Sequence, residues 1–541
     1  MKRLVSLALL CTMLFSLVAC SGTGDAGTTG SATTTVPRAD GIPKDATVSV
    51  WMSESFNKVH GSARPPEDKL TTFSLQSAKN EKESCHVSIR IDQEAKDLTF
   101  RQIEGKAAGI TVELLEEFLV DAGTKDVPDP IIPFDGTFDV EKNKNKNLLI
   151  RFAVSKEATA GDYVYKFEMA DAAGSVIETF TVNLKVWNIT LPDELSCDSA
   201  TNISKDTISL YELVEVTEAY GPYYKAYYDM CIDYGFSPHD LPYDILDERA
   251  DAYMSNPRVT GFRIDHSLPD KELTQIYEKL KTNPVWLEKA HFYVFDEPTD
   301  TAKLNAAAET AKRVKALCPE IDVLVTFFTN VKCNNQQDQI DFMTDFVDVY
   351  CAKSAAWDTD WLADPLNKGY FGDRMDTLKS LGNKVWWYVC WEPVEYCNLF
   401  ANEMGVRHRQ LFWQQYANNV DGFLYWWSNY WTSVLHPSKK AVYSDNPQGV
   451  RVYGDGVLLY PGLDFGIQGP VASLRLECIR NGVEDFDLLK LAEQQLGKEW
   501  VLEQIGKVSP SLSEFTTSNE LFSSVRKDIG DALEKALTNS Q

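Results

Sequence analysis

Short apolar runs alternate with helical stretches through much of this chain, and this rhythm constrains its fold more than any other feature. A run that is apolar throughout is typical of a strand in a parallel sheet, because helices cover both faces of such a sheet. Helical patterns fit between the runs, and residues 301–317 place their apolar side chains on one stripe. The strand-like runs lie at residues 199–204, 231–236, 259–265, 290–296, 322–328, 347–352, 384–391 and 420–427. Eight strands with eight helices predict a closed, TIM-like (β/α)8 barrel over residues 193–497.

The region before this barrel has a different pattern. Apolar and polar residues alternate with period two at residues 48–51, 86–91 and 181–187, and turn-forming residues separate these segments. The pattern predicts an antiparallel β-sandwich over residues 45–192. Residues 498–541 have the pattern of amphipathic helices, which we expect to pack on the barrel.

The N-terminus has the pattern of an export signal. Lys2 and Arg3 precede an uncharged apolar run, which predicts a signal peptide over residues 1–19. The run ends in Leu-Val-Ala-Cys, which resembles a bacterial lipobox and makes the Cys20 thiol a lipidation site. Residues 20–44 are rich in Gly, Ser and Thr and would form a flexible linker. We therefore expect an extracytoplasmic protein anchored to the bacterial cell envelope by an N-terminal lipid only; a plain signal peptide cleaved elsewhere is the alternative.

Charge and cysteine usage exclude several classes of partner. The chain has 53 basic and 79 acidic residues and a formal net charge of −26, which repels nucleic acid and favours a neutral substrate. Its 11 cysteines show no short paired spacings, so neither a zinc site nor a disulfide framework is indicated. We expect no metal and no cofactor, and the sequence leaves the oligomeric state open.

Two adjacent carboxylates, Asp296 and Glu297, follow the fourth predicted strand. Reacting groups in such barrels lie where strands end, so this pair is the first candidate for catalysis. Burial and mutual repulsion oppose ionisation of both groups, which suits the division between an acid and a charged carboxylate in glycoside cleavage. In the alternative interpretation the pair only caps the next helix together with Asp300, with Pro298 in the first turn.

Aromatic residues are dense in the last two predicted strands and their loops. Sugar rings stack well on such side chains, so a sugar-binding platform is predicted there. The candidate substrate-binding residues are Tyr388, Trp391, Trp426, Asn429 and Trp431. Arg263, Asp265 and His266 also lie at a predicted strand end and could bind hydroxyl groups, although hydrogen bonds that structure a loop explain such residues equally well.

A third carboxylate, Glu392, follows the seventh predicted strand. An acid after strand four and a nucleophile after strand seven would allow an ordinary double displacement by Glu297 and Glu392. The two carboxyl groups would then lie about 5 to 5.5 Å apart. Double displacement by Glu297 and Glu392 is therefore an alternative mechanism.

Several ordered motifs resemble glycoside hydrolase family 123, the β-N-acetylgalactosaminidases and their relatives. The motifs are Pro128-Asp129-Pro130, Phe295-Asp296-Glu297-Pro298, Trp386-Trp387-Tyr388, Asp421 to Trp426, Gly454 to Gly462, Ser473 to Glu477 and Arg480 to Asp485. The resemblance implies an exo-acting, retaining enzyme that removes terminal N-acetylgalactosamine from a glycan or glycolipid. The 2-acetamido oxygen of the sugar would be the nucleophile, Glu297 the general acid and base, and Asp296 the residue that orients the acetamido group. A non-catalytic, glycan-binding surface lipoprotein is the remaining alternative.

Overall fold

The computed structural model describes residues 42–539, apart from gaps at 44, 124, 215–220, 328–331, 334–336, 359–371, 392–393, 432–442 and 446–450. The predicted signal peptide, Cys20 and Glu392 lie outside the described residues. Among the described helices, none is both long enough and apolar enough to cross a membrane.

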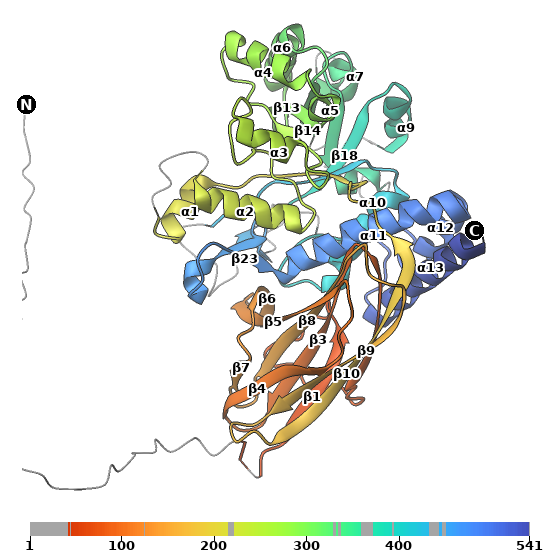
Figure 1. Cartoon of the computed structure of the whole chain (residues 1–541). Helices are drawn as coiled ribbons and strands as arrows, with labels where there is room; N and C mark the ends of the chain where they lie inside the picture. Colours follow the sequence, from red (N-terminus) through yellow and green to blue (C-terminus); the bar gives the residue numbers. More distant parts are fainter. Residues whose placement is uncertain are drawn as a thin grey trace, which may run out of the picture. The chain divides into compact units, whose positions relative to one another are not determined.

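Two stacked sheets form the region that the sequence predicts as a sandwich (Figure 1). The larger sheet contains β1 (Val48–Glu54), β3 (Glu81–Ile91), β8 (Asn145–Val154), β5 (Ile110–Asp121) and β6 (Asp126–Pro133), followed by β23 (Pro470–Ser473) and β22 (Leu459–Pro461). The smaller sheet contains β2 (Thr72–Lys79), β10 (Val176–Thr190), β9 (Gly161–Ala170), β4 (Ala95–Glu104) and β7 (Thr137–Val140). Side chains from both sheets, such as Val87 and Phe167, share one buried core. The sandwich is antiparallel as predicted, except that β2 pairs with β10 in parallel.

A third sheet holds seven parallel strands and forms a nearly closed barrel. In spatial order they are β11 (Asp198–Thr201), β19 (Gly422–Tyr425), β18 (Lys384–Val389), β17 (Val349–Lys353), β14 (Asp322–Phe327), β13 (Ala290–Phe295) and β12 (Phe262–Arg263). Each overlaps one of the predicted runs, so seven of the eight predicted strands are confirmed.

The strand predicted at residues 231–236 is wrong. The first half of this apolar run belongs to α2 (Pro222–Asp233), which buries Tyr224, Tyr227, Tyr228 and Cys231 at helical spacing. A short apolar run does not by itself distinguish a strand from a buried helix segment.

A short extended segment takes the place of the missing strand between β11 and β12. Thr201 pairs with Pro238 in an isolated parallel bridge, and the Arg263 amide donates to the His239 carbonyl oxygen at 2.7 Å. The barrel is therefore nearly closed, but the regular eightfold (β/α)8 architecture is not confirmed.

The barrel strands alternate between an inner and an outer layer, as period two requires. Trp386 and Tyr388 belong to a small inner cluster with Leu324 and Leu424, whereas Trp387 packs in the outer core against the helices. Gly422 makes this arrangement possible, because a Cβ atom there would lie 2.4 Å from the Trp386 ring.

Helices surround the barrel and link it to the sandwich. Before β14 they are α1 (Lys205–Tyr211), α2, α3 (Asp251–Met254), α4 (Asp270–Leu280), α5 (Pro284–Lys289) and α6 (Thr301–Leu317). Later in the chain they are α7 (Gln339–Met343), α9 (Gly372–Ser380), α10 (Gly405–Ala417), α11 (Leu474–Leu496), α12 (Lys498–Gly506) and α13 (Asn519–Asn539). Figure 1 shows the long helix α11 beside α10, and it also contacts β3 and β6 of the sandwich. The predicted C-terminal helices are present as α12 and α13.

Short elements complete the fold. They are the two-stranded ladders of β15 (Lys332–Cys333) with β16 (Gln337–Asp338) and of β20 (Tyr443–Asp445) with β21 (Arg451–Tyr453), and the 3-10 turns η1 (Glu248–Ala250), η2 (Ser354–Trp357) and η3 (Gly462–Phe465).

Candidate active site

Asp296 and Glu297 stand directly after the last residue of β13, at the carboxyl edge of the barrel. The helix that follows, α6, is capped by Asp300, whose side chain accepts a hydrogen bond from the Lys303 amide at 2.9 Å. The alternative interpretation of the sequence was that Asp296, Glu297 and Asp300 together cap this helix. In the structure Asp300 caps it, and the cap does not require Asp296 or Glu297.

Two neutral hydroxyl groups hold Asp296. Tyr293 Oη and Thr326 Oγ1 each donate to Asp296 Oδ1, at 2.8 Å in both cases. Burial, followed by the nearby Asp296 charge, raises the pKa of Tyr293 well above its usual value. The Tyr293 phenol therefore stays protonated, and it fixes one carboxylate oxygen while the side chain of Asp296 remains exposed.

Glu297 is held by its backbone as well as by its side chain. Its φ is +47°, in the left-handed region that residues other than glycine rarely adopt. The Glu297 amide donates to Thr326 Oγ1 at 3.0 Å, and Tyr388 Oη donates a short hydrogen bond to Glu297 Oε1. Burial, together with the Glu297 charge, raises the pKa of Tyr388 well above its usual value, so Tyr388 remains a donor. Thr326 thus contacts both members of the pair.

Both carboxylates open into a cavity of about 330 Å³ at the barrel mouth. Aromatic side chains form much of its wall, and Thr326 and Tyr388 reach it from β14 and β18. The full lining comprises Asn202, Tyr293, Asp296, Glu297, Thr326, Tyr388, Cys390, Trp391, Leu424, Trp426 and Trp427. Acid groups in a cavity of this size with aromatic walls suit a small hydroxylated ligand such as one sugar unit.

The loop after β21 fixes the position of Trp426. Trp426 Nε1 donates to Asp455 Oδ1 at 2.9 Å, and the buried Tyr425 hydroxyl donates to the same oxygen at 3.2 Å. Gly456 has a φ of +74°, and a Cβ atom there would lie 2.6 Å from the Trp426 ring. Burial raises the pKa of Asp455 to about 6, although the bonds from Trp426 and Tyr425 oppose that rise.

The structure brings some of the predicted substrate-binding residues to the cavity and places others elsewhere. Tyr388, Trp391 and Trp426 line it, whereas Asn429 and Trp431 are not part of its lining. Asn429 is buried, with its side chain bonded to both backbone groups of Ser204, and Trp431 Nε1 donates to the Leu459 carbonyl oxygen at 2.9 Å. Asn429 therefore ties the segment just after β19 to Ser204 before α1, and Trp431 ties it to β22.

Sequence reasoning missed Tyr293, Thr326 and Trp427 as residues of the cavity wall. Thr326 is a hydroxyl residue near the end of a strand, directly after the apolar residues 323–325, which is the signal that could have identified it. Tyr293 lies within the fourth predicted run, and nothing local distinguishes it from a core residue.

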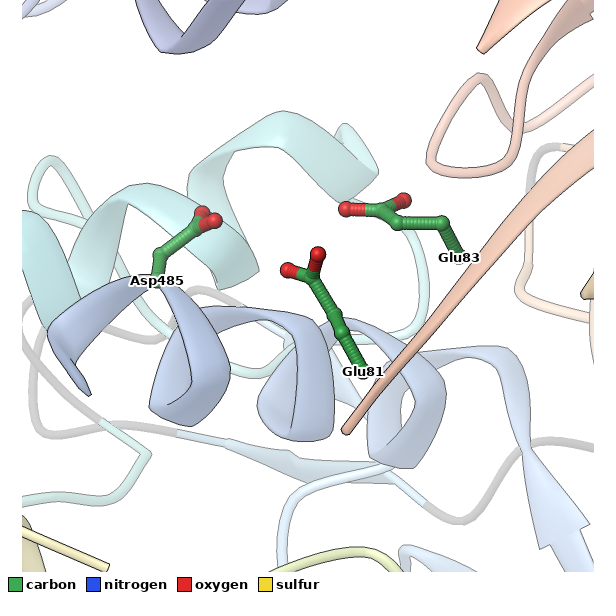
Figure 2. Close-up of side chains that lie close together, drawn as sticks. All are labelled: Glu81, Glu83 and Asp485. Atoms are coloured by element: carbon green, nitrogen blue, oxygen red, sulfur yellow. The ribbon is translucent and has the colours of Figure 1, made fainter. Parts of the chain in front are cut away.

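Another group of carboxylates, Glu81, Glu83 and Asp485, has the spacing of a metal site but is compensated by protein cations. Figure 2 shows the three side chains converging, and one oxygen of each lies within 4.8 Å of the others. Arg409 pairs with Glu83 and Asp485 at 2.6 Å each, and Arg526 pairs with all three carboxylates. Burial opposes ionisation of Asp485, but the two guanidinium groups outweigh it and lower the pKa of this carboxyl. We assign this cluster a structural role.

The fold of this chain is similar to that of a protein of known structure. A family 123 glycoside hydrolase from Clostridium perfringens, whose structure was analysed for glycolipid glycan hydrolysis, shares 13% identity with this chain. The match covers 91% of this chain and 98% of that one with a TM-score of 0.65, so the two share a fold. A glycosyl hydrolase family 2 member from Bacteroides cellulosilyticus matches at 9% identity over 70% of this chain and 46% of that one, with a TM-score of only 0.22. No curated protein matches the chain.

A family model assigns the part of the chain that carries the acidic pair. Residues 268–492 match the glycoside hydrolase 123 catalytic domain, and this segment includes Asp296, Glu297, Tyr388 and Trp426. The chain therefore carries a glycoside hydrolase 123 catalytic domain, and the resemblance to glycoside hydrolase family 123 that its motifs predicted is confirmed.

Proposed function

We propose that this glycoside hydrolase removes terminal β-linked N-acetylgalactosamine and retains the anomeric configuration, with the acetamido group of the substrate as nucleophile. The arrangement of the two carboxylates supports this proposal. The Thr326 hydroxyl is hydrogen-bonded to the Asp296 side chain and to the Glu297 amide, and both carboxylates face one cavity with aromatic walls. A cavity of about 330 Å³ suits one terminal sugar, which supports exo action.

In the first step Glu297 donates its proton to the glycosidic oxygen as the bond to the leaving group breaks. The acetamido oxygen attacks the anomeric carbon and closes an oxazoline ring. Asp296, oriented by Tyr293 and Thr326, accepts a hydrogen bond from the acetamido nitrogen and stabilises its positive charge. In the second step Glu297 takes a proton from water, the water oxygen attacks the anomeric carbon, and the ring opens to the retained product.

Adjacent positions suit these two roles. The acetamido nitrogen and the glycosidic oxygen lie on neighbouring carbons of one sugar, so two carboxylates on consecutive residues reach both. The left-handed φ of Glu297 turns its side chain out of the regular strand alternation, so it joins Tyr388 at the cavity.

The test compares three aryl substrates: β-N-acetylgalactosaminide, its N-acetylglucosamine epimer and plain β-galactoside. The proposal expects cleavage of the first, with the β-anomer of the product appearing first by NMR. Cleavage of the plain galactoside alone contradicts it, because that sugar has no acetamido group. A loss of turnover in Glu392→Gln that matches the loss in Glu297→Gln would favour double displacement instead.

The location at the cell envelope is also a proposal, supported by the N-terminal Leu-Val-Ala-Cys sequence. A glycolipid or glycan at the outer face of a membrane would then be within reach of the enzyme. Incorporation of labelled palmitate into the wild-type protein, and its loss in Cys20→Ser, would support lipidation; equal labelling of both would contradict it.

A further inference from the structure

A second cavity lies beside the aromatic one, and Tyr293 belongs to the wall of both. Its volume is about 450 Å³. Arg263 is the last residue of β12, and Asp265 and His266 follow it in the wall of this cavity. Both cavities therefore lie at the carboxyl ends of the barrel strands, where substrates of barrel enzymes bind.

The second cavity has more charged side chains in its wall than the first. Acidic side chains outnumber basic ones in its wall, which contains Asp240, Asp244, Asp265 and Glu272 against Lys205, Arg263 and the imidazole of His266. Asp265 also fixes a turn, because its carboxylate accepts from the Ser267 amide at 2.8 Å. Burial opposes its ionisation, but the bonds from Ser267 prevail and lower its pKa, so the group remains charged at neutral pH.

An ion pair in the wall presents donors and acceptors together. Arg263 Nε and Nη2 donate to the two carboxylate oxygens of Asp240 at 3.0 and 2.8 Å. Their side chains are 27% and 42% exposed, so solvent or a ligand reaches both. Arg263 Nη1 has no hydrogen-bond partner among the described residues, while each Asp240 oxygen keeps a lone pair for a further donor.

We propose that this charged cavity binds the sugar adjoining the one that is cleaved, and that it selects a neutral, hydroxyl-rich sugar over an anionic one. The inference rests on the proposed function, because an exo-acting enzyme meets the rest of its substrate outside the pocket for the terminal sugar. Neighbouring hydroxyl groups both donate and accept, which matches the Arg263–Asp240 pair. A uronic acid or sulfated sugar would place a negative charge among four carboxylates that only two cations offset.

The experiment compares kcat/KM on three substrates that share a terminal β-N-acetylgalactosamine. Their leaving groups are nitrophenol, galactose and glucuronic acid. In Arg263→Ala we expect the ratio of the galactose substrate to the aryl substrate to fall about tenfold, since bonds from a charged donor are lost only with the disaccharide. The wild-type protein should prefer the galactose to the glucuronic acid substrate, and Glu272→Gln should narrow that preference.

The matched control is Arg101→Ala, which removes an arginine from an exposed ion pair with Glu168 in the sandwich and should leave all three ratios unchanged. Two results would overturn the inference. One is an unchanged ratio of kcat/KM between the galactose and aryl substrates in folded Arg263→Ala, and the other is equal kcat/KM of the wild-type protein on the galactose and glucuronic acid substrates. If Arg263→Ala does not fold, Asp240→Asn replaces it under the same expectation.

A failure of the proposed function can be distinguished from a failure of this inference. If the wild-type protein does not cleave the aryl glycoside, calorimetric binding of the galactose disaccharide decides the inference by itself. Binding to wild type that weakens in Arg263→Ala supports the second site, whereas equal binding or none at all overturns it.

Discussion

Two groups of carboxylates in this chain have different partners. Glu81, Glu83 and Asp485 lie buried where β3 meets α11, and Arg409 and Arg526 bind them with charged hydrogen bonds, of which the Arg409–Asp485 contact is bidentate. Asp296 and Glu297 stand at a cavity, and the side-chain hydrogen bonds described for them come from hydroxyl groups of tyrosine and threonine. The first arrangement fixes charge inside the protein, whereas the second orients acid groups toward a ligand.

The difference shows what distinguishes a structural carboxylate from a chemical one. An arginine partner neutralises a buried carboxylate, and removal of either partner leaves an uncompensated charge. A hydroxyl partner orients a carboxylate without neutralising it, so the group can still exchange a proton or face a developing positive charge. Both groups consist of aspartate and glutamate side chains, so the partners of each carboxylate, and not its residue type, decide its role.

The largest effect should come from Glu297→Gln, because Gln keeps the shape but cannot transfer a proton. We expect kcat to fall about 10²- to 10⁴-fold on N-acetylgalactosaminides, with little change in the unfolding free energy. Steady-state kinetics and urea denaturation measure the two. Residual activity near the wild-type level would exclude Glu297 as the acid.

Arg409→Met should do the reverse and act on stability. The substitution leaves Glu83 and Asp485 with one cation fewer in a buried site, which should lower the unfolding free energy by about 3 to 5 kcal/mol. Guanidinium denaturation measures the loss, and Arg101→Met at an exposed pair is the control, with less than about 1 kcal/mol expected. Equal losses in both variants would remove the distinction between the buried cluster and an ordinary surface pair.

Thr326→Val tests whether one hydroxyl positions both carboxylates. Valine keeps the shape but removes the donor to Asp296 and the acceptor for the Glu297 amide, so kcat/KM should fall about tenfold with KM little changed. Thr326→Ser, which keeps the hydroxyl, should recover most of the activity. A serine variant as impaired as the valine variant would show that packing, not the hydroxyl, matters.

A pH-dependent effect on stability concerns Glu484 of the buried network, whose pKa burial raises to about 8 although Arg480 opposes the rise. The folded state therefore holds this proton more tightly than the unfolded chain, so the contribution to stability is present below pH 4.5 and is lost as pH rises through about 8. Glu484→Gln has no such loss, so its stability relative to wild type should increase between pH 5 and 8. A constant difference across that pH range in denaturation experiments would contradict the shift.

Much of the fold followed from local pattern. The strand-like run at residues 384–391 predicted β18, and the structure places Trp386 and Tyr388 on one side of that strand and Trp387 on the other, as period two requires. The apolar stripe predicted α6, and its bounds at Thr301–Leu317 are those of the predicted segment. The run at residues 231–236 was misread because helix and strand both bury short apolar segments, and only the tyrosines before it show the helical period.

The sequence by itself determined that Asp296 and Glu297 end an apolar strand and that the chain carries the motifs of a known family of glycoside hydrolases. Those features depend on neighbours in the chain, so local pattern is enough. Only the tertiary structure decided which residues surround the pair: Tyr388 lies 91 positions from Glu297, and Arg409 lies 326 positions from Glu83. Such contacts form when strands and helices pack together, so they cannot be predicted from the spacing of residues along the chain.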